Sequence, residues 1–347
     1  MQSRIWRAHL KLTHTWRIAR GDGTRDFPVV LFELTDADGR TGIGESAPIA
    51  RYDENVDTVE AFLRRVDAHN LSFTDVDESM KYLETIAPGQ HAAKCAVNIA
   101  LLDGAAKLAS QPIYDFLKLG FTEGKHVSSF SIGIDKPDVI REKVREASRF
   151  PVLKLKVGTA DEEANFGALC DIAPEKPVRV DANEGWKSKE DALRRIQWFH
   201  RDGHVQFVEQ PMPASMPIAD WAWLKERSPL PIFADESYHN AADAARAAEC
   251  FHGVNVKLVK TAGISGAYDA LRAARKLGLK TMIGCMIETS VLISAAAHLA
   301  ELADHLDIDG NILINNDPYQ GPTTEKGIVS FASAPEKFGL RVIPRSS

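Results

Sequence analysis

The chain has 347 residues, of which 44% are hydrophobic and 26% charged, and its formal net charge is −6. This composition is typical of a globular protein with a sizeable core, and the length allows about two domains. The acidic balance without a basic tract argues against a nucleic-acid partner. No apolar run is long enough to span a membrane, and no signal-peptide pattern or metal-type cysteine spacing occurs. We therefore expect a cytoplasmic protein.

The first part of the chain has the pattern of a mixed α+β unit. Residues 5–12 and 27–36 alternate like strands, and the turn signal DADGR precedes a third candidate, TGIGES. Helical patterns follow over residues 56–69, 78–86 and 90–110, and Pro112 ends the last of them. We therefore predict an α+β N-terminal domain over residues 1–125.

From residue 126 onward, short apolar strands alternate with helical stretches. Strand–helix repeats at intervals of roughly 20 to 30 residues predict an α/β fold with a parallel sheet closed into a barrel. An open doubly wound sheet is the rival, but no G-x-G-x-x-G follows any strand. We predict a barrel over residues 126–321 and a C-terminal segment, 322–347, that returns to the first domain. The eight candidate strands are VSSFSIGI, VLKLKVG, VRVDAN, VQFVEQP, PIFADES, GVNVKLVK, KTMIGCM and HLDIDG.

Three carboxylates lie near the ends of consecutive candidate strands. They are Asp181 in VDAN, Glu209 in VEQP and Asp235 in ADES. Neighbouring strands lie about 4.8 Å apart, so the three groups should converge and would repel each other unless a cation joins them. Oxygen-only ligands favour Mg²⁺, with Mn²⁺ as the alternative. The competing interpretation is separate solvated acids or acids paired with lysines.

Lysines lie on the strands to either side of these acids. Lys154 and Lys156 lie two apart in VLKLKVG, so both should face the same side of the strand, and Lys257 ends NVK. Lys156 and Lys257 should reach a bound substrate from opposite directions. We expect burial, the cation and the adjacent ammonium to disfavour the charged form, so that each can act as a base. The alternative is lysines that extend to solvent at the barrel rim.

These groups together suit the removal of a proton next to a carboxylate. The resulting enediolate needs concentrated positive charge, which Mg²⁺ and Lys154 would supply. One lysine would remove the proton and the other would return a proton on the opposite face. The predicted reaction is a racemisation or an epimerisation.

The chain resembles the enolase superfamily, in its muconate-lactonizing subgroup. The resemblance rests on KLKVG, VDANEGW, VEQP, FADES, NVKLVKTAGISG and GCMIETS, and it covers essentially the whole chain. It implies an α+β capping domain on a (β/α)7β TIM-like barrel. It also implies that Asp181, Glu209 and Asp235 bind the metal and that Lys156 and Lys257 are the acid/base pair, assisted by Lys154. Lys260, three residues after the second base, is expected to point elsewhere.

Asp307 and Asp309, in LDIDG at the eighth strand end, indicate the substrate. Two carboxylates on one face suit a cationic group. The pattern is similar to that of the dipeptide epimerases, including L-Ala-D/L-Glu epimerases, in which such a pair binds the free ammonium of the substrate. That resemblance implies inversion of the second residue of an L-Ala-X dipeptide, a role in peptidoglycan recycling if X is Glu, and a homo-oligomer. The alternative for the pair is a rim ion pair or a turn cap.

The loops at 14–26 and 46–55 should cover the barrel mouth and read the substrate's side chain. An arginine such as Arg20 would bind a glutamate side chain, whereas a hydrophobic X is the alternative. We also expect Ser131 and Lys154 to contact the substrate. The rival activities in the subgroup are o-succinylbenzoate synthase, N-acylamino acid racemase and muconate-type cycloisomerase, and a rival from another class is an idle, metal-stabilised binding protein.

Overall fold

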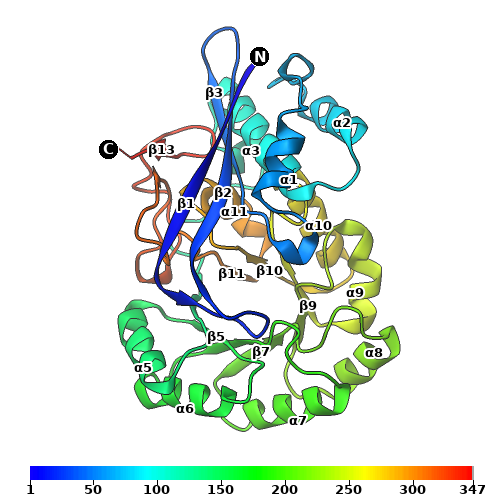
Figure 1. Ribbon diagram of the computed structural model, residues 1–347, viewed down its shortest axis with the longest axis vertical. Coiled ribbons are helices and arrows are strands. Elements are labelled where there is room, and N and C mark those ends of the chain that lie inside the picture. Colours follow the sequence, from blue (N-terminus) through cyan, green and yellow to red (C-terminus); the bar gives the residue numbers. More distant parts are fainter. Residues whose placement is uncertain (346–347) are drawn as a thin grey trace.

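A three-stranded antiparallel sheet forms the N-terminal part of the molecule, in the order β1 (Gln2–Trp16), β2 (Thr24–Thr35) and β3 (Thr41–Ser46). The computed structural model describes residues 1–345. Three helices accompany the sheet (Figure 1): α1 (Val56–Leu63), α2 (Val76–Ile86) and α3 (His91–Leu108). Helix α3 lies directly on β3, where a Cβ on Gly44 would lie only 1.9 Å from the Ala96 carbonyl oxygen. Glycine is therefore required for this close helix–sheet contact.

Eight parallel strands form the second sheet, and they occur in chain order from β4 to β11. The two edge strands meet through a bridge between Ser128 and Leu306, and the Ser129 amide donates to the Leu306 carbonyl at 3.1 Å. All eight predicted strands are present, and the predicted barrel fold with an N-terminal α+β unit is confirmed. The strands are β4 (Phe130–Ile132), β5 (Leu153–Lys156), β6 (Val178–Asp181), β7 (Val205–Glu209), β8 (Ile232–Ala234), β9 (Gly253–Val256), β10 (Lys280–Gly284) and β11 (His305–Asp307).

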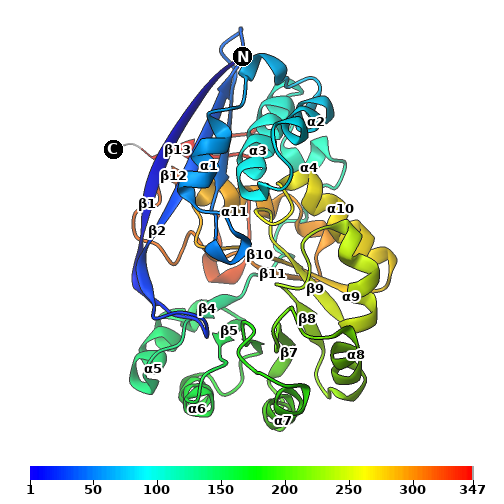
Figure 2. The same ribbon diagram turned by 45° about the vertical axis from the view of Figure 1, so that its right-hand side comes forward.

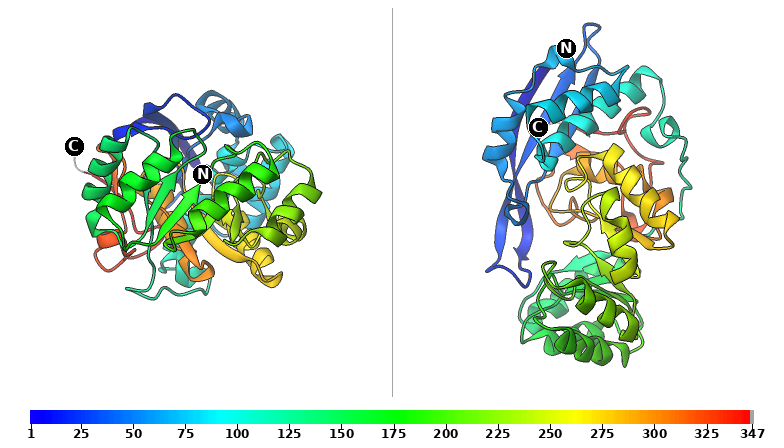
Figure 3. Two further views of the ribbon diagram at one scale, coloured as in Figure 1. Left: turned by 90° about the horizontal axis from the view of Figure 1, so that it is seen from below. Right: turned by 90° about the vertical axis from the view of Figure 1, so that its right-hand side faces the viewer.

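Helices connect successive strands, and the view from below shows the green barrel helices on the outside of the strands (Figure 3). Their apolar faces pack inward, as periodic sequences of this kind require. The crossover helices are α5 (Pro137–Glu146), α6 (Glu162–Ile172), α7 (Lys189–His200), α8 (Ile218–Arg227), α9 (Ala244–Cys250), α10 (Ile264–Lys276) and α11 (Ser290–Ala297). Apart from short 3-10 helices, the remaining described elements are α4 (Ile113–Phe116), β12 (Tyr319–Gln320) and β13 (Ile343–Pro344). Within residues 1–345, no helix is both long and apolar enough to cross a membrane.

The β1–β2 hairpin extends from the N-terminal sheet to the barrel, and its tip lies beside β4 and β5 (Figure 2). The amide of Ile134, just after β4, donates to the Arg17 carbonyl in the hairpin at 2.9 Å. Glu45 of β3 is buried and accepts from the Thr289 amide at 2.9 Å and the Leu292 amide at 3.2 Å, at the start of α11. These contacts fix the N-terminal part over the barrel, because a carboxylate suits the N-terminal amides of a helix.

The C-terminal segment contacts both α3 and the chain that follows it. The Leu340 amide donates to Asp103 of α3 at 2.8 Å, and the Ile113 amide donates to the Gly339 carbonyl at 3.1 Å. Among described residues 322–345, the only regular strand is the two-residue β13. The domain boundaries at 125 and 321 stay a prediction, and residues 346–347 of the predicted segment lie outside the described residues.

Candidate active site

The register of the parallel strands brings the site together, because it places charged side chains from neighbouring strands at the same height in the barrel. Lys156 on β5 pairs with Asp181 on β6, and Asp181 pairs with Glu209 on β7. Asp235 follows directly after β8 (Ile232–Ala234). The three acids are at most 1% exposed. As predicted, they lie at the carboxyl ends of neighbouring barrel strands, where barrel enzymes place their catalytic groups.

Lys154 is at the centre of this group of acids. Its Nζ lies 2.6 Å from Asp307 Oδ2, 2.7 Å from Glu209 Oε2 and 3.1 Å from Asp181 Oδ2. Lys156 Nζ lies 2.6 Å from the same Asp181 oxygen. The two lysines of the K-x-K strand therefore do point to one side, and carboxylates compensate their charges as buried lysines require.

Asp235 is held by two lysines from the segment after β9 (Gly253–Val256). Lys257 Nζ lies 2.9 Å from Asp235 Oδ2, and Lys260 Nζ lies 2.7 Å from Asp235 Oδ1. Lys260 also donates to the Asp235 backbone carbonyl at 2.6 Å. The prediction that Lys260 points elsewhere is wrong, because this side chain is fully buried against the same acid as Lys257.

The charges of Lys154 and Lys257 are stabilised in this arrangement. Burial opposes the charge on Lys154, but Asp307 and the other carboxylates outweigh it and hold the pKa of Lys154 above its ordinary value. Burial likewise opposes the charge on Lys257, whose pKa is nevertheless raised by Asp235. In these ion pairs, proximity to a carboxylate favours the ammonium form. The expected lowering of the lysine pKa by burial, a bound cation and the adjacent ammonium stays a prediction for the cation-bound site.

The three acids Asp181, Glu209 and Asp235 fit a hard divalent cation, although lysines now contact their carboxylates. Among the residues described, no group of three His, Cys, Asp or Glu side chains is arranged to hold a metal ion as it stands. The reason is that Lys154 lies between Asp181 and Glu209, while Lys257 and Lys260 hold Asp235. Glu209 Oε2 is buried and receives no well-aligned hydrogen bond, although Lys154 Nζ is 2.7 Å away. Three buried, oxygen-only side chains suit Mg²⁺.

Removal of the Lys154 charge should destabilise the fold. Lys154→Met keeps the length of the side chain but leaves three buried carboxylates without their shared counter-ion, and loss of one partner of a buried ion pair costs about 3–5 kcal/mol. We expect the free energy of unfolding, measured by urea denaturation without divalent cations, to fall by about that amount. Lys276→Met, at an exposed position on α10, is the matched control and should change it by less than about 0.5 kcal/mol. Equal midpoints for the two variants would contradict the expectation.

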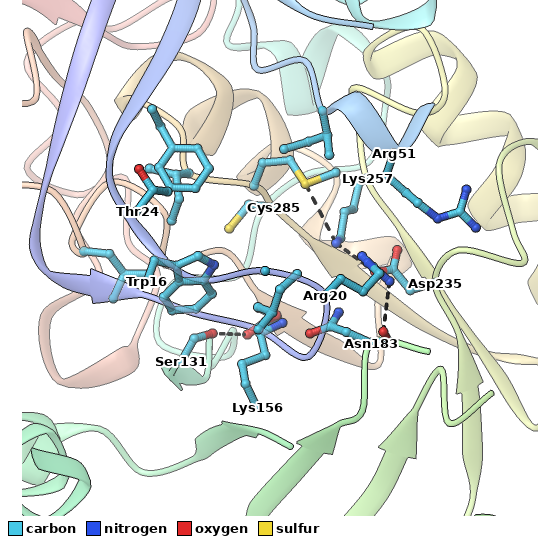
Figure 4. Close-up of a pocket in the computed structure, with 18 of the residues that line it drawn as sticks. Trp16, Arg20, Thr24, Arg51, Ser131, Lys156, Asn183, Asp235, Lys257 and Cys285 are labelled. Carbon is cyan, nitrogen blue, oxygen red and sulfur yellow. Dashed lines mark hydrogen bonds and ion pairs between the residues drawn. The ribbon is translucent and has the colours of Figure 1, made fainter. Parts of the chain in front are cut away.

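A cavity of about 340 Å³ lies above these groups, between the barrel and the β1–β2 hairpin. Lys156 and Lys257 enter it from different sides (Figure 4). Trp16 of the hairpin covers Lys156, whose Nζ lies 5.7 Å from the centre of the indole ring. Apolar side chains therefore cover part of the cavity, and charged groups at the strand ends line its floor. Its apolar lining includes Trp16, Ile18, Phe27, Ile49, Tyr52, Met286, Ile287 and Leu313.

Asp307 and Asp309 both line this cavity but differ in their contacts. Asp307 binds Lys154 and accepts from the Ser129 hydroxyl at 2.6 Å and the Ser131 hydroxyl at 3.3 Å. Asp309 Oδ2 accepts from the Ser131 amide at 2.6 Å. Burial and the charge of Asp307 raise the pKa of Asp309 to about 7. Asp309 is thus the carboxylate with no cationic partner among the described residues, and Ser131 contacts both acids.

Arg20 also lines the cavity, but carboxylates already bind it. Its Nη1 lies 2.8 Å from Glu184 Oε2 and 2.5 Å from Glu236 Oε1. Arg51, from the predicted cap loop at 46–55, also binds Glu184. Glu184, Glu236 and Arg51 were not among the predicted site residues. The available signal was their position, since Glu184 lies in VDANEGW and Glu236 directly follows Asp235.

A barrel with buried acids and lysines at the carboxyl ends of its strands, covered by a second domain, defines a class of barrel enzymes. Residues 139–340 match the model of the enolase C-terminal domain-like family, and residues 7–118 match the N-terminal domain of mandelate racemase and muconate lactonizing enzyme. The chain belongs to this branch of the enolase superfamily.

Known relatives cover the whole chain. An L-Ala-D/L-amino acid epimerase from Pedosphaera parvula is 62% identical over 344 residues, which is 99% of either chain. A substrate-liganded L-Ala-D/L-Glu epimerase from Bacillus subtilis has a TM-score of 0.92 at 26% identity, covering 100% of this chain and 99% of the other. A dipeptide epimerase from Enterococcus faecalis, complexed with Mg and L-Leu-L-Tyr, has a TM-score of 0.88 at 28% identity, covering 98% of both chains. The chain is an enzyme of the isomerase class.

Proposed function

We propose that this enzyme is a dipeptide epimerase that inverts the α-carbon of the second residue of an L-Ala-X dipeptide. One observation carries the proposal: Lys156 and Lys257 reach one cavity from different sides, and Asp309 lines the same cavity. A carbon between two lysines can lose a proton to one and gain a proton from the other. The names of the relatives above support dipeptides as the substrate class.

Each charged group has a role in this reaction. Lys156 and Lys257 are the acid/base pair, and either Nζ must be a neutral amine to accept the α-proton. Asp181, Glu209 and Asp235 would hold Mg²⁺, which would offset the negative charge that develops on the substrate carboxylate when its α-proton leaves. Lys154 adds a fixed positive charge between these acids, and its burial keeps water from screening that charge.

The acids at the end of β11 would orient the dipeptide. Asp309 is available for the free ammonium of the first residue, and Asp307 is held beside it by Lys154 and the Ser131 hydroxyl. With the ammonium at Asp309 and the carboxylate directed toward Asp235, the α-carbon of the second residue would lie between the two lysines. An N-acylated substrate has no positive charge to offer Asp309, which disfavours the rival N-acylamino acid racemase and o-succinylbenzoate synthase activities.

The ammonium contact can be tested with matched substrates. A charge-assisted hydrogen bond contributes roughly 1.5–3 kcal/mol, or about 10- to 150-fold in kcat/KM. The kcat/KM for L-Ala-X dipeptides should therefore exceed that for their N-acetylated forms by about that factor, and Asp309→Asn should reduce this ratio of kcat/KM values. Incorporation of deuterium from D₂O, followed by mass spectrometry, measures both substrates. Asp269→Asn, at an exposed position on α10, should leave the ratio unchanged. A wild-type preference for N-acetylated substrates would assign the chain to a rival activity.

A further inference from the structure

Arg20 is the only arginine of the 14–26 loop that lines the cavity among the described residues, and its charge is already compensated. Its Nη1 donates to Glu184 Oε2 at 2.8 Å, to Glu236 Oε1 at 2.5 Å and to the Asn183 carbonyl at 3.0 Å. The contact with Asn183 is visible in Figure 4. Glu236 is 1% exposed and Glu184 is 6% exposed, whereas the Arg20 side chain is 30% exposed, so water screens these pairs only in part.

Glu184 is held in place by several further contacts. Its carboxylate accepts from Arg51 Nε and Nη2, both at 3.0 Å, and from the Ala214 amide at 2.8 Å. Asn183 and Glu184 both have left-handed backbone, with φ of 42° and 66°. Two consecutive residues in this conformation carry a cost that the surrounding contacts must offset. Glu184 is therefore a fixed carboxylate that ties both cap loops to the end of β6.

The charges of this cluster sum to zero when both carboxyl groups are ionised, although burial and the charge of Asp235 raise the pKa of Glu236 to about 7. Arg20 and Arg51 contribute two positive charges, and Glu184 and Glu236 contribute two negative ones. The other cap side chains around the cavity are mainly apolar, including Trp16, Ile18, Phe27, Ile49 and Tyr52. A substrate carboxylate placed here would lose its hydration, gain no uncompensated positive charge and lie near two fixed carboxylates.

We propose that Glu184, together with Glu236, neutralises Arg20 and makes the enzyme select an uncharged second residue in its dipeptide. Glu184 is thus a specificity-determining residue, although it has no need to touch the substrate. The inference rests on the proposed function, because it concerns the side chain of the residue that is epimerised. It assigns the substrate class as L-Ala-X with X neutral, such as methionine or glutamine, and disfavours X as glutamate.

Three dipeptides of nearly equal length test the preference of the wild-type enzyme. L-Ala-L-Glu and L-Ala-L-Gln differ in one charge at almost constant shape, and L-Ala-L-Met is their apolar counterpart. We expect kcat/KM for the glutamine and methionine dipeptides to exceed that for the glutamate dipeptide by about tenfold or more, the lower bound for one charged hydrogen bond. The readout is the ratio of kcat/KM for L-Ala-L-Glu to kcat/KM for L-Ala-L-Gln, called the glutamate-to-glutamine ratio, because a general loss of activity does not change this ratio.

Variants identify the residue responsible. Glu184→Gln leaves Arg20 with one carboxylate instead of two, and it should raise the glutamate-to-glutamine ratio by about tenfold. Arg20→Met added to that variant should remove the gain. Glu163→Gln, at an exposed position on α6, makes the same change in net charge and should leave the ratio at the wild-type value.

Several outcomes would overturn the inference. These are a wild-type enzyme that prefers L-Ala-L-Glu, an active Glu184→Gln variant with an unchanged ratio, and an Arg20→Met variant of the wild type in which the ratio falls tenfold. The last outcome would show that Arg20 reads glutamate directly, and it decides the matter even if Glu184→Gln fails to fold. Turnover of N-acylated amino acids with no turnover of any dipeptide would instead refute the proposed function.

Discussion

Replacing Lys156 or Lys257 with alanine is expected to stop epimerisation while each variant retains one-sided proton exchange. The two Nζ atoms are anchored at different acids, Lys156 at Asp181 and Lys257 at Asp235, and the two side chains enter one cavity from different sides. Loss of a general acid or base lowers the rate by about 10²- to 10⁴-fold. Epimerisation requires both groups, whereas exchange of the α-proton requires only the lysine that faces it.

The measurement uses both stereoisomers of one dipeptide in D₂O. Chiral chromatography follows inversion, and mass spectrometry follows deuterium uptake. The Lys156 variant should exchange one isomer only, and the Lys257 variant should exchange the other. Lys276→Ala, at an exposed position on α10, should behave as the wild type does. Epimerisation at near wild-type rates by both site variants would rule out the two-base mechanism, and loss of exchange in both isomers would indicate a single base.

The parts of the site that lie on strands could be predicted from the sequence. An apolar strand ending in an acid, repeated once per strand–helix unit, places Asp181 and Glu209 at one level because parallel strands share their register. The two-residue period also placed Lys154 and Lys156 on one side. Both are consequences of local geometry, which a single sequence contains.

Lys260 was misplaced because the strand ends before it. The expectation treated residues 257–260 as extended chain, in which a spacing of three reverses the direction of the side chain. Instead the chain turns: the Lys260 amide donates to the Lys257 carbonyl at 3.0 Å, and the Gly263 amide donates to the Leu258 carbonyl at 2.9 Å. This turn brings Lys260 back to Asp235, on the same side as Lys257.

The ion pairs of Arg20 and Asp307 could not be predicted because their partners are remote in sequence. Arg20 meets Glu184 and Glu236 across more than 160 residues, and Lys154 meets Asp307 across 153. The residue types show that these positions carry charged side chains. Which of the charges form ion pairs depends on the closed barrel and on the placement of the β1–β2 hairpin. This pairing leaves Asp309 rather than Arg20 as the group with charge to offer the substrate.

Chelation of divalent cations is expected to abolish turnover, and added Mg²⁺ should restore it. The physical reason is the set of three acids, at most 1% exposed, at the ends of β6, β7 and β8. Asp235→Asn removes one anionic ligand. Loss of a group that merely orients a metal ligand lowers affinity by about 10- to 100-fold, so loss of a ligand should cost at least that much.

Isothermal titration of the chelated enzyme with Mg²⁺ measures affinity independently of turnover. The Asp235→Asn variant should bind Mg²⁺ at least about tenfold more weakly than the wild type. Asp269→Asn, at an exposed position on α10, should bind it equally well. Asp235 has two possible states, paired with lysines or bound to the cation, and the titration distinguishes them. Lys257 and Lys260 now hold its carboxylate, so the lysines and the cation must share this carboxylate when Mg²⁺ binds. Full activity in excess EDTA would show that the lysine-paired arrangement is sufficient and that the three acids have a structural role.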